Sequence, residues 1–177
     1  MDFKGRHFES TIILMSVRWY CSYSLSYRNI EELMFERGIN VDHSTLNRWV
    51  VKYSPELEKK FKGYKRRTGD SWRMDETYVK VKGQWKYLYR AVDKDGNTID
   101  FLLTAKRDKK AALRFFKKAI GTNETPRVVN IDKSGANESA LKNYNLNNDV
   151  DIIIRQCKFL NNIVESDHRR IKRIINL

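Results

Sequence analysis

Three carboxylates stand at positions where folding alone does not readily explain an acid. Asp75 interrupts an apolar, strand-like run, Asp132 ends another such run, and Glu165 opens a basic helix near the end of the chain. A partly buried carboxylate loses hydration, and a metal ion, a hydrogen-bond partner or a functional role must offset that cost. Three such acids in a strongly basic chain predict metal-dependent phosphodiester chemistry.

Two of these acids have structural alternatives. Asp132 precedes a predicted helix that extends to about Tyr144, so it is also placed to cap that helix. Glu165 and His168 stand three residues apart on a helix, which also fits a surface pair worth roughly tenths of a kcal/mol. For Asp75 the structural alternative is weakest, because aspartate is disfavoured inside strands and cannot cap a helix there.

The composition of the chain indicates a polyanionic partner. It has 35 Lys and Arg residues against 22 Asp and Glu residues, a formal net charge of +13. Such a charge attracts nucleic acid over long range, and a merely soluble basic surface is the alternative. Cys21 and Cys157 are too few for a disulfide framework or a metal site built from paired cysteines. Without a signal peptide or an apolar span we expect a cytoplasmic, nucleoid-associated protein with no membrane partner.

Residues 1–58 have the apolar spacing of helices and predict a helix-turn-helix module. Its first helix is expected from Tyr27 to Arg37, with a glycine stop at Gly38, and its recognition helix from Ser44 to Tyr53. Trp49 falls on the apolar stripe and is expected in the core. A glycine-linked helix pair that never binds DNA is the alternative. The candidates for DNA contact are His43, Ser44, Thr45, Asn47 and Arg48.

Residues 59–70 form a basic segment with two aromatics, which fits either a DNA-tracking linker or a solvated helix end. From residue 71 to residue 177 the pattern changes to strands and helices. Strands are expected at 74–81, 84–92, 98–103 and 127–132, the first three antiparallel, with a helix at 109–120. The fold class is therefore α/β, with a mixed sheet in which Asp132 ends a buried strand, where ligands collect in open α/β sheets.

A last helix is predicted from Asn161 and Asn162 onward. Glu165, His168 and Lys172 share one face of it at i, i+3 and i+7. If this helix packs on the sheet, it brings Glu165 to the two strand-borne acids.

Five segments of the chain together resemble a known family. They are Phe3-Lys4-Gly5-Arg6-His7-Phe8, Val41 to Val50, Met74-Asp75-Glu76-Thr77-Tyr78-Val79-Lys80-Val81, Trp85 to Asp93, and Asn161-Asn162-Ile163-Val164-Glu165-Ser166-Asp167-His168. On these motifs the chain resembles bacterial insertion-sequence transposases of the DDE type, in the group of short elements that form cointegrates.

The resemblance implies an RNase H-like catalytic core. Asp75, Asp132 and Glu165 correspond to the catalytic triad, which in the family holds two Mg²⁺ ions, with Mn²⁺ as a substitute. Asp75 is then expected at both ions, Asp132 at one and Glu165 at the other. Lys172 matches the family's basic partner, and with His168 it is expected at the DNA backbone. The implied partners are the terminal inverted repeats of the element, target DNA and further copies of the chain in a homo-oligomer.

The chain departs from the family pattern in two ways, and these departures leave two functions to be distinguished. Family members usually continue well beyond the Glu-bearing helix, whereas this chain stops at Leu177, and the interval from Asp132 to Glu165 is slightly short. The resemblance thus implies a transposase, truncated at its C-terminus, that cleaves 3' ends and transfers strands. The alternative is a catalytically inactive DNA-binding remnant, or an inhibitor of the full-length transposase.

Overall fold

The computed structural model describes residues 1–4, 7–65, 67–157 and 162–175. The chain forms two compact units, one of Met1–Arg66 with Arg173–Leu177 and one of Arg67–Lys172. Each unit has its own hydrophobic core. None of the helices in the described part of the chain combines the length and apolarity needed to cross a membrane.

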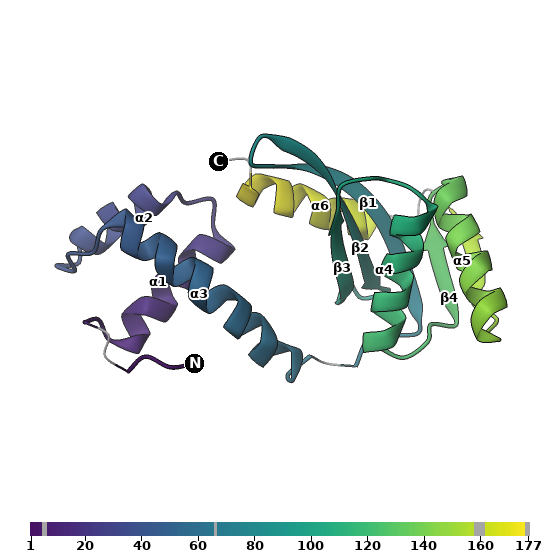
Figure 1. Ribbon diagram of the computed structural model, residues 1–177, viewed down its shortest axis with the longest axis horizontal. Helices are drawn as coiled ribbons and strands as arrows, with labels where there is room; N and C mark the ends of the chain where they lie inside the picture. The colour runs from purple at the N-terminus through teal and green to yellow at the C-terminus, as the bar shows by residue number, and fades with distance from the viewer. Residues whose placement is uncertain (5–6, 66, 158–161, 176–177) are drawn as a thin grey trace. The chain divides into compact units, whose positions relative to one another are not determined.

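The first unit contains α1 (Ser10–Ser22), α2 (Tyr27–Phe35) and α3 (His43–Lys62) (Figure 1). A capping box at Ser26 starts α2, where the Ser26 hydroxyl accepts the backbone N–H of Asn29 at 3.1 Å. The three helices bury one apolar cluster, in which Trp49 is a core residue, as the sequence predicts. Its buried members are Ile13, Val17, Ile30, Met34, Val41, Leu46, Trp49, Val50 and Tyr53.

The connection between α2 and α3 depends on glycine. Gly38 has φ +73°, a left-handed conformation that other residues adopt only with strain, and the next residue, Ile39, donates its N–H to the Met34 carbonyl at 2.9 Å. Asp42 then caps α3 by accepting the N–H groups of Ser44 and Thr45. Helix α2 ends at Phe35, short of the predicted Arg37, and α3 continues beyond Tyr53 to Lys62, into the segment expected as a linker.

The second unit is built on a five-stranded mixed sheet with the order β3-β2-β1-β4-β5. The strands are β1 (Ser71–Val81), β2 (Gln84–Asp93), β3 (Thr98–Thr104), β4 (Val128–Ile131) and β5 (Ile153–Gln156). Strands β1, β2 and β3 are antiparallel neighbours, whereas β4 runs parallel to β1 and β5 parallel to β4. The predicted mixed sheet is confirmed, and β5 is an additional edge strand.

Helices cover both faces of this sheet. The side chains of Trp72 and Met74 on β1 join the core formed with α4 (Lys109–Thr122) and α5 (Gly135–Asn148). The side chain of Asp75 projects from the other face of β1, where it lies next to His168 of α6 (Asn162–Ile175). Because side chains alternate along a strand, α6 lies on the face opposite to α4 and α5.

Candidate active site

Asp75 on β1 and Asp132, which directly follows the parallel neighbour β4, stand at the same level of the sheet. The ladder between β1 and β4 pairs Arg73 with Asn130, and each acid stands two residues farther along its own strand. The side chain of Asp132 is 37% exposed, just past the carboxyl end of β4. This is the position in an open α/β sheet where ligands bind.

Helix α6 reaches the same strand through two contacts. His168 is buried, and its Nδ1 lies 3.4 Å from Oδ2 of Asp75. One turn later the Nζ of Lys172 lies 4.7 Å from the ring centroid of Tyr78, which follows Asp75 on β1. Two of the three residues predicted to share a face of α6, His168 and Lys172, therefore contact β1. Burial of His168 does not suit the expected phosphate contact, because an imidazole packed against a carboxylate in the interior is withdrawn from DNA.

Glu165 is exposed in the first turn of α6, one turn before His168. Among residues 1–4, 7–65, 67–157 and 162–175, no three His, Cys, Asp or Glu side chains gather closely enough to hold one metal ion. The structure thus places Asp75 and Asp132 on adjacent strands without bringing Glu165 into a common cluster with them. Their carboxylate oxygens are nevertheless the hard donors that Mg²⁺ prefers.

A fourth acid, Glu76, adjoins this site and is absent from the predicted triad. Its side chain is only 2% exposed and forms a salt bridge with Nε of Arg107. Its other oxygen, Oε2, accepts Nδ2 of Asn137 at 2.9 Å. Burial raises the pKa of Glu76 above its usual value, and the hydrogen bond from Asn137 and the charge of Arg107 only partly oppose that rise.

The same two partners link Glu76 to Asp132. Nη2 of Arg107 lies 3.5 Å from Oδ2 of Asp132, and Nδ2 of Asn137 lies 3.4 Å from its Oδ1. Asp132 Oδ1 also accepts the backbone N–H of Ser134 at 3.1 Å. Ser134, not Asp132, is the N-cap of α5, so the helix-cap alternative for Asp132 is not what the structure shows. Arg107 and Asn137 each bridge a buried acid and a half-exposed one.

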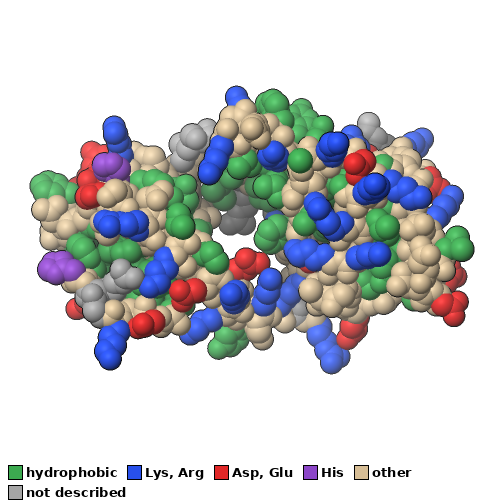
Figure 2. Space-filling view, in the orientation of Figure 1, with side chains coloured by type: hydrophobic (Ala, Val, Ile, Leu, Met, Phe, Trp, Pro, Cys, Tyr) green, Lys and Arg blue, Asp and Glu red, His purple; other side chains and the backbone are tan. Residues whose placement is uncertain are grey.

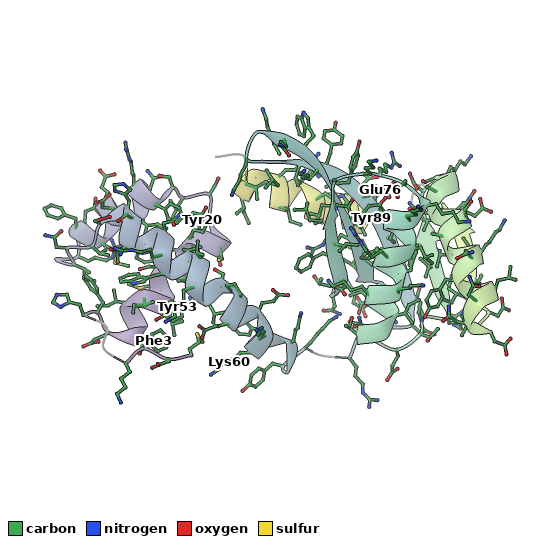
Figure 3. All side chains as sticks on the ribbon, in the orientation of Figure 1. Phe3, Tyr20, Tyr53, Lys60, Glu76 and Tyr89 are labelled. Atoms are coloured by element: carbon green, nitrogen blue, oxygen red, sulfur yellow. The ribbon has the colours of Figure 1, made fainter. Side chains whose placement is uncertain are left out.

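Strand alternation could have revealed the burial of Glu76. Trp72 and Met74 are apolar and precede it at two-residue steps, which places Glu76 on the core side of β1. Figure 3 shows Glu76 beside Tyr89, its register partner on β2. Burial, together with the negative charge of Glu76, raises the pKa of Tyr89 to about 12. The negative charge of Glu76 thus contributes to the raised pKa of a neighbouring side chain in the core.

The residues predicted to contact DNA lie at the start of α3. Four of them, with Tyr27, line a shallow hollow in the surface of the first unit: His43, Ser44, Asn47 and Arg48. The hydroxyl of Thr45 accepts a hydrogen bond from Nη2 of Arg48 at 2.8 Å, which orients that guanidinium. Nδ1 of His43 lies 3.1 Å from Glu31. The structure therefore brings these predicted residues together on one exposed surface.

A family model and two sequence relatives point to one family. A family model described as a DDE domain, DDE_Tnp_IS240, matches residues 69–177. The chain is 40% identical over 174 residues to the transposase for insertion sequence-like element IS431mec of Staphylococcus aureus, a match that covers 96% of this chain and 76% of that protein. The identity and coverage are the same for the Staphylococcus aureus transposase for insertion sequence element IS257 in transposon Tn4003.

Among solved structures, the fold resembles the catalytic core domain of HTLV-2 integrase in complex with magnesium. The TM-score is 0.50 at 18% sequence identity, over 58% of this chain and 66% of that chain. This likeness establishes the fold of the core as the RNase H-like mixed sheet that the family resemblance implies. With a matching DDE domain and close relatives along nearly its whole length, the chain belongs to the DDE transposases of insertion sequences.

Proposed function

We propose that this protein binds the ends of an insertion sequence and catalyses metal-dependent cleavage at their 3' ends, followed by strand transfer into target DNA. The observation that carries the proposal is that Asp75 on β1 and Asp132, just past the end of the adjacent parallel strand β4, stand at the same level by register, with α6 packed over Asp75. In a chain of net charge +13, acids at the same level of neighbouring parallel strands suit a cation that also meets phosphate.

Each residue of the candidate active site has its own role in the proposed cleavage and strand transfer. Asp75 and Asp132, with Glu165 from α6, would hold two Mg²⁺ ions, or Mn²⁺ in their place. When bound, such ions lower the pKa of an attacking water or 3'-hydroxyl and neutralise the leaving oxygen. His168 orients the Asp75 carboxylate from the protein interior. Lys172, at the same face of α6, is the cation of this group that remains for a phosphate.

End recognition is assigned to the first unit. The first two turns of α3 present polar and basic side chains, of which Asn47 and Arg48 have the reach and donors to contact bases, while His43, Ser44 and Thr45 suit the backbone. On this proposal α2 and α3 act as a helix-turn-helix. Because the complex joins two element ends, the working assembly is a homo-oligomer on DNA.

The decisive experiment measures strand transfer on labelled DNA that carries the terminal inverted repeats, with Mg²⁺ or Mn²⁺. Asp75→Asn is expected to abolish cleavage and leave end binding intact, since it removes a metal ligand and spares the first unit. Asp95→Asn, an exposed acid in the β2–β3 turn, is the matched control and should cleave normally. Metal-dependent product from Asp75→Asn would contradict the assignment.

A different result would favour the second candidate function. If the unaltered protein binds element ends and yields no product with either metal, it acts as a DNA-binding inhibitor of a longer transposase. Adding it to an active relative would then lower product formation, whereas an active enzyme would raise it.

A further inference from the structure

The hairpin of β1 and β2 exposes two large aromatic side chains. Tyr78 is 57% exposed and Trp85 is 60% exposed, and their rings meet edge to face with centroids 5.3 Å apart. Aromatic surface of this size is usually buried, and an exposed aromatic group bordered by polar side chains marks an interaction site.

Cations stand at both ends of this ring pair. Nζ of Lys80 lies 5.8 Å from the Trp85 centroid, and Nζ of Lys172 lies 4.7 Å from the Tyr78 centroid. Each ring of the pair therefore has a lysine beside it. Figure 2 shows hydrophobic side chains at the end of this hairpin with Lys or Arg side chains beside them. We name the surface of Tyr78, Lys80, Trp85 and Lys172 the hairpin platform.

The hairpin platform is held in place by its backbone. Its two-residue turn, Lys82 and Gly83, has φ values of +49° and +78°, as in the type I′ turns that match strand twist. Lys80 and Trp85 are register partners, and the ladder is continuous from Trp72 to Val81. In the described part of the chain, Lys80, Lys82 and Lys86 form no ion pair with a carboxylate. Their charges are available to an external anion.

We infer that the hairpin platform binds unpaired nucleotides of DNA. Each ring offers a face on which any base can stack, and the lysines lie where the adjoining phosphates would run. A second copy of this chain is disfavoured as the occupant, because it would bring a net charge of +13 against the same lysines. Aromatic rings interleaved with uncompensated cations fit single-stranded nucleic acid.

The position of the hairpin platform relates it to the proposed chemistry. Tyr78 stands three residues after Asp75 on β1, roughly 10 Å along the strand, and because side chains alternate it projects from the opposite face of the strand. A nucleotide stacked there would belong to an unpaired segment of the DNA whose cleaved phosphate lies on the Asp75 face of the sheet. This part of the inference rests on the proposed function, whereas the binding of unpaired nucleotides does not.

The test uses the whole protein without divalent metal and measures binding of an oligothymidine that contains 2-aminopurine, beside a blunt duplex of mixed sequence. Stacking on the rings should quench the 2-aminopurine fluorescence. Trp85→Ala is expected to weaken binding of the single strand on the order of tenfold, while Trp85→Phe keeps most of it. Phe35→Ala removes an aromatic that is 72% exposed on α2 and is the matched control.

Loss of single-strand affinity in Trp85→Ala, with duplex affinity and the Phe35→Ala control unchanged, supports the inference. Equal affinity of Trp85→Ala and the unaltered protein overturns it, as does failure of the unaltered protein to bind the oligothymidine. Equal loss on single strand and duplex also overturns it, since that result indicates charge or folding and not stacking. None of these measurements involves cleavage, so the strand-transfer assay can fail or succeed independently of them.

Discussion

Glu76 is a buried acid whose pKa is raised by burial. The carboxylate is fixed between Arg107 and Asn137, and both of these side chains also reach Asp132. A buried ionic group is costly to create, yet removing one partner leaves the others unpaired, which costs more. Glu76 is therefore best understood as a support for Asp132 and not as a third metal ligand.

Replacing Glu76 tests this support through pH. Folding raises the pKa of Glu76, so between its unfolded and folded values the folded chain keeps a proton that the unfolded chain has lost. The contribution of Glu76 to the free energy of unfolding is then largest below the usual glutamate pKa and falls as the pH rises through the folded-state value. Urea unfolding across this range should show that fall in the unaltered protein and not in Glu76→Gln, which cannot titrate.

Glu76→Ala is the companion variant. It leaves Arg107 and Asn137 without their buried acceptor, and we expect a loss of about 2 kcal/mol in the free energy of unfolding at neutral pH. Parallel pH profiles for the unaltered protein and Glu76→Gln, or an unchanged stability of Glu76→Ala, would show that this buried acid has no such role.

One strand of the sheet ends in an aspartate and another is followed directly by one, and the surroundings of the two acids differ. Asp93, at the end of β2, is buried and accepts the N–H groups of Gly69, Asp95 and Asn97 at 2.8–3.1 Å, with the Asn97 amide at 3.0 Å. Burial alone would raise the pKa of Asp93, but these hydrogen bonds outweigh it and lower the pKa. Asp93 thus closes the β2–β3 turn, while Asp132 keeps exposed oxygens for a ligand.

The β2–β3 turn should therefore depend on Asp93. Asp93→Ala removes a charged acceptor of several N–H groups, and we expect it to lower the free energy of unfolding by about 3 kcal/mol, with Asp93→Asn at about half that loss. Since the folded pKa is depressed, this stabilisation is present above the usual aspartate pKa and is lost as the pH falls through the folded value. Urea titrations at neutral and acidic pH measure both effects, and a loss independent of pH would contradict the account.

Where the sequence has a clear hydrophobic period or a turn signal, it predicts the correct helices and strands. Alternation from Trp72 onward and the Lys82-Gly83 turn fix β1 and β2, and the glycine stop at Gly38 separates α2 from α3. Strand β5 escaped prediction because its four residues form an edge with one partner strand and little burial. The environments of Glu76 and His168 depend on which helix packs on which face of the sheet, and that information is not local to the sequence.

At the scale of the whole molecule, the charge of +13 makes binding to any DNA strong at low salt. Recognition of element ends must be measured above this background. We expect Arg48→Ala to weaken binding to terminal-repeat DNA by about tenfold and to unrelated DNA much less, because Arg48 lies in the hollow at the start of α3. Arg18→Ala, an exposed arginine of α1, is the matched control.

Fluorescence anisotropy at several salt concentrations distinguishes these effects. Loss of a contact to a base changes the ratio of affinities for the two DNAs. Loss of a contact to phosphate lowers both affinities and reduces the slope of log affinity against log salt concentration by about one. Equal behaviour of Arg48→Ala and Arg18→Ala would argue against the placement of the recognition surface on α3.

The two hydrophobic cores predict two separable unfolding transitions. Ile30 is fully buried among the three N-terminal helices, and Phe116 is fully buried between the sheet and its helices. Truncating a large buried side chain to alanine costs about 2–5 kcal/mol, and that cost falls on the cooperative unit that contains the cavity. Ile30→Ala should therefore destabilise the first unit alone, and Phe116→Ala the second alone. Hydrogen exchange read by mass spectrometry assigns each loss to its peptides. If either substitution accelerates exchange equally in α3 and in β1, the two cores unfold as one, and the helical unit cannot be treated as an independent DNA-binding module.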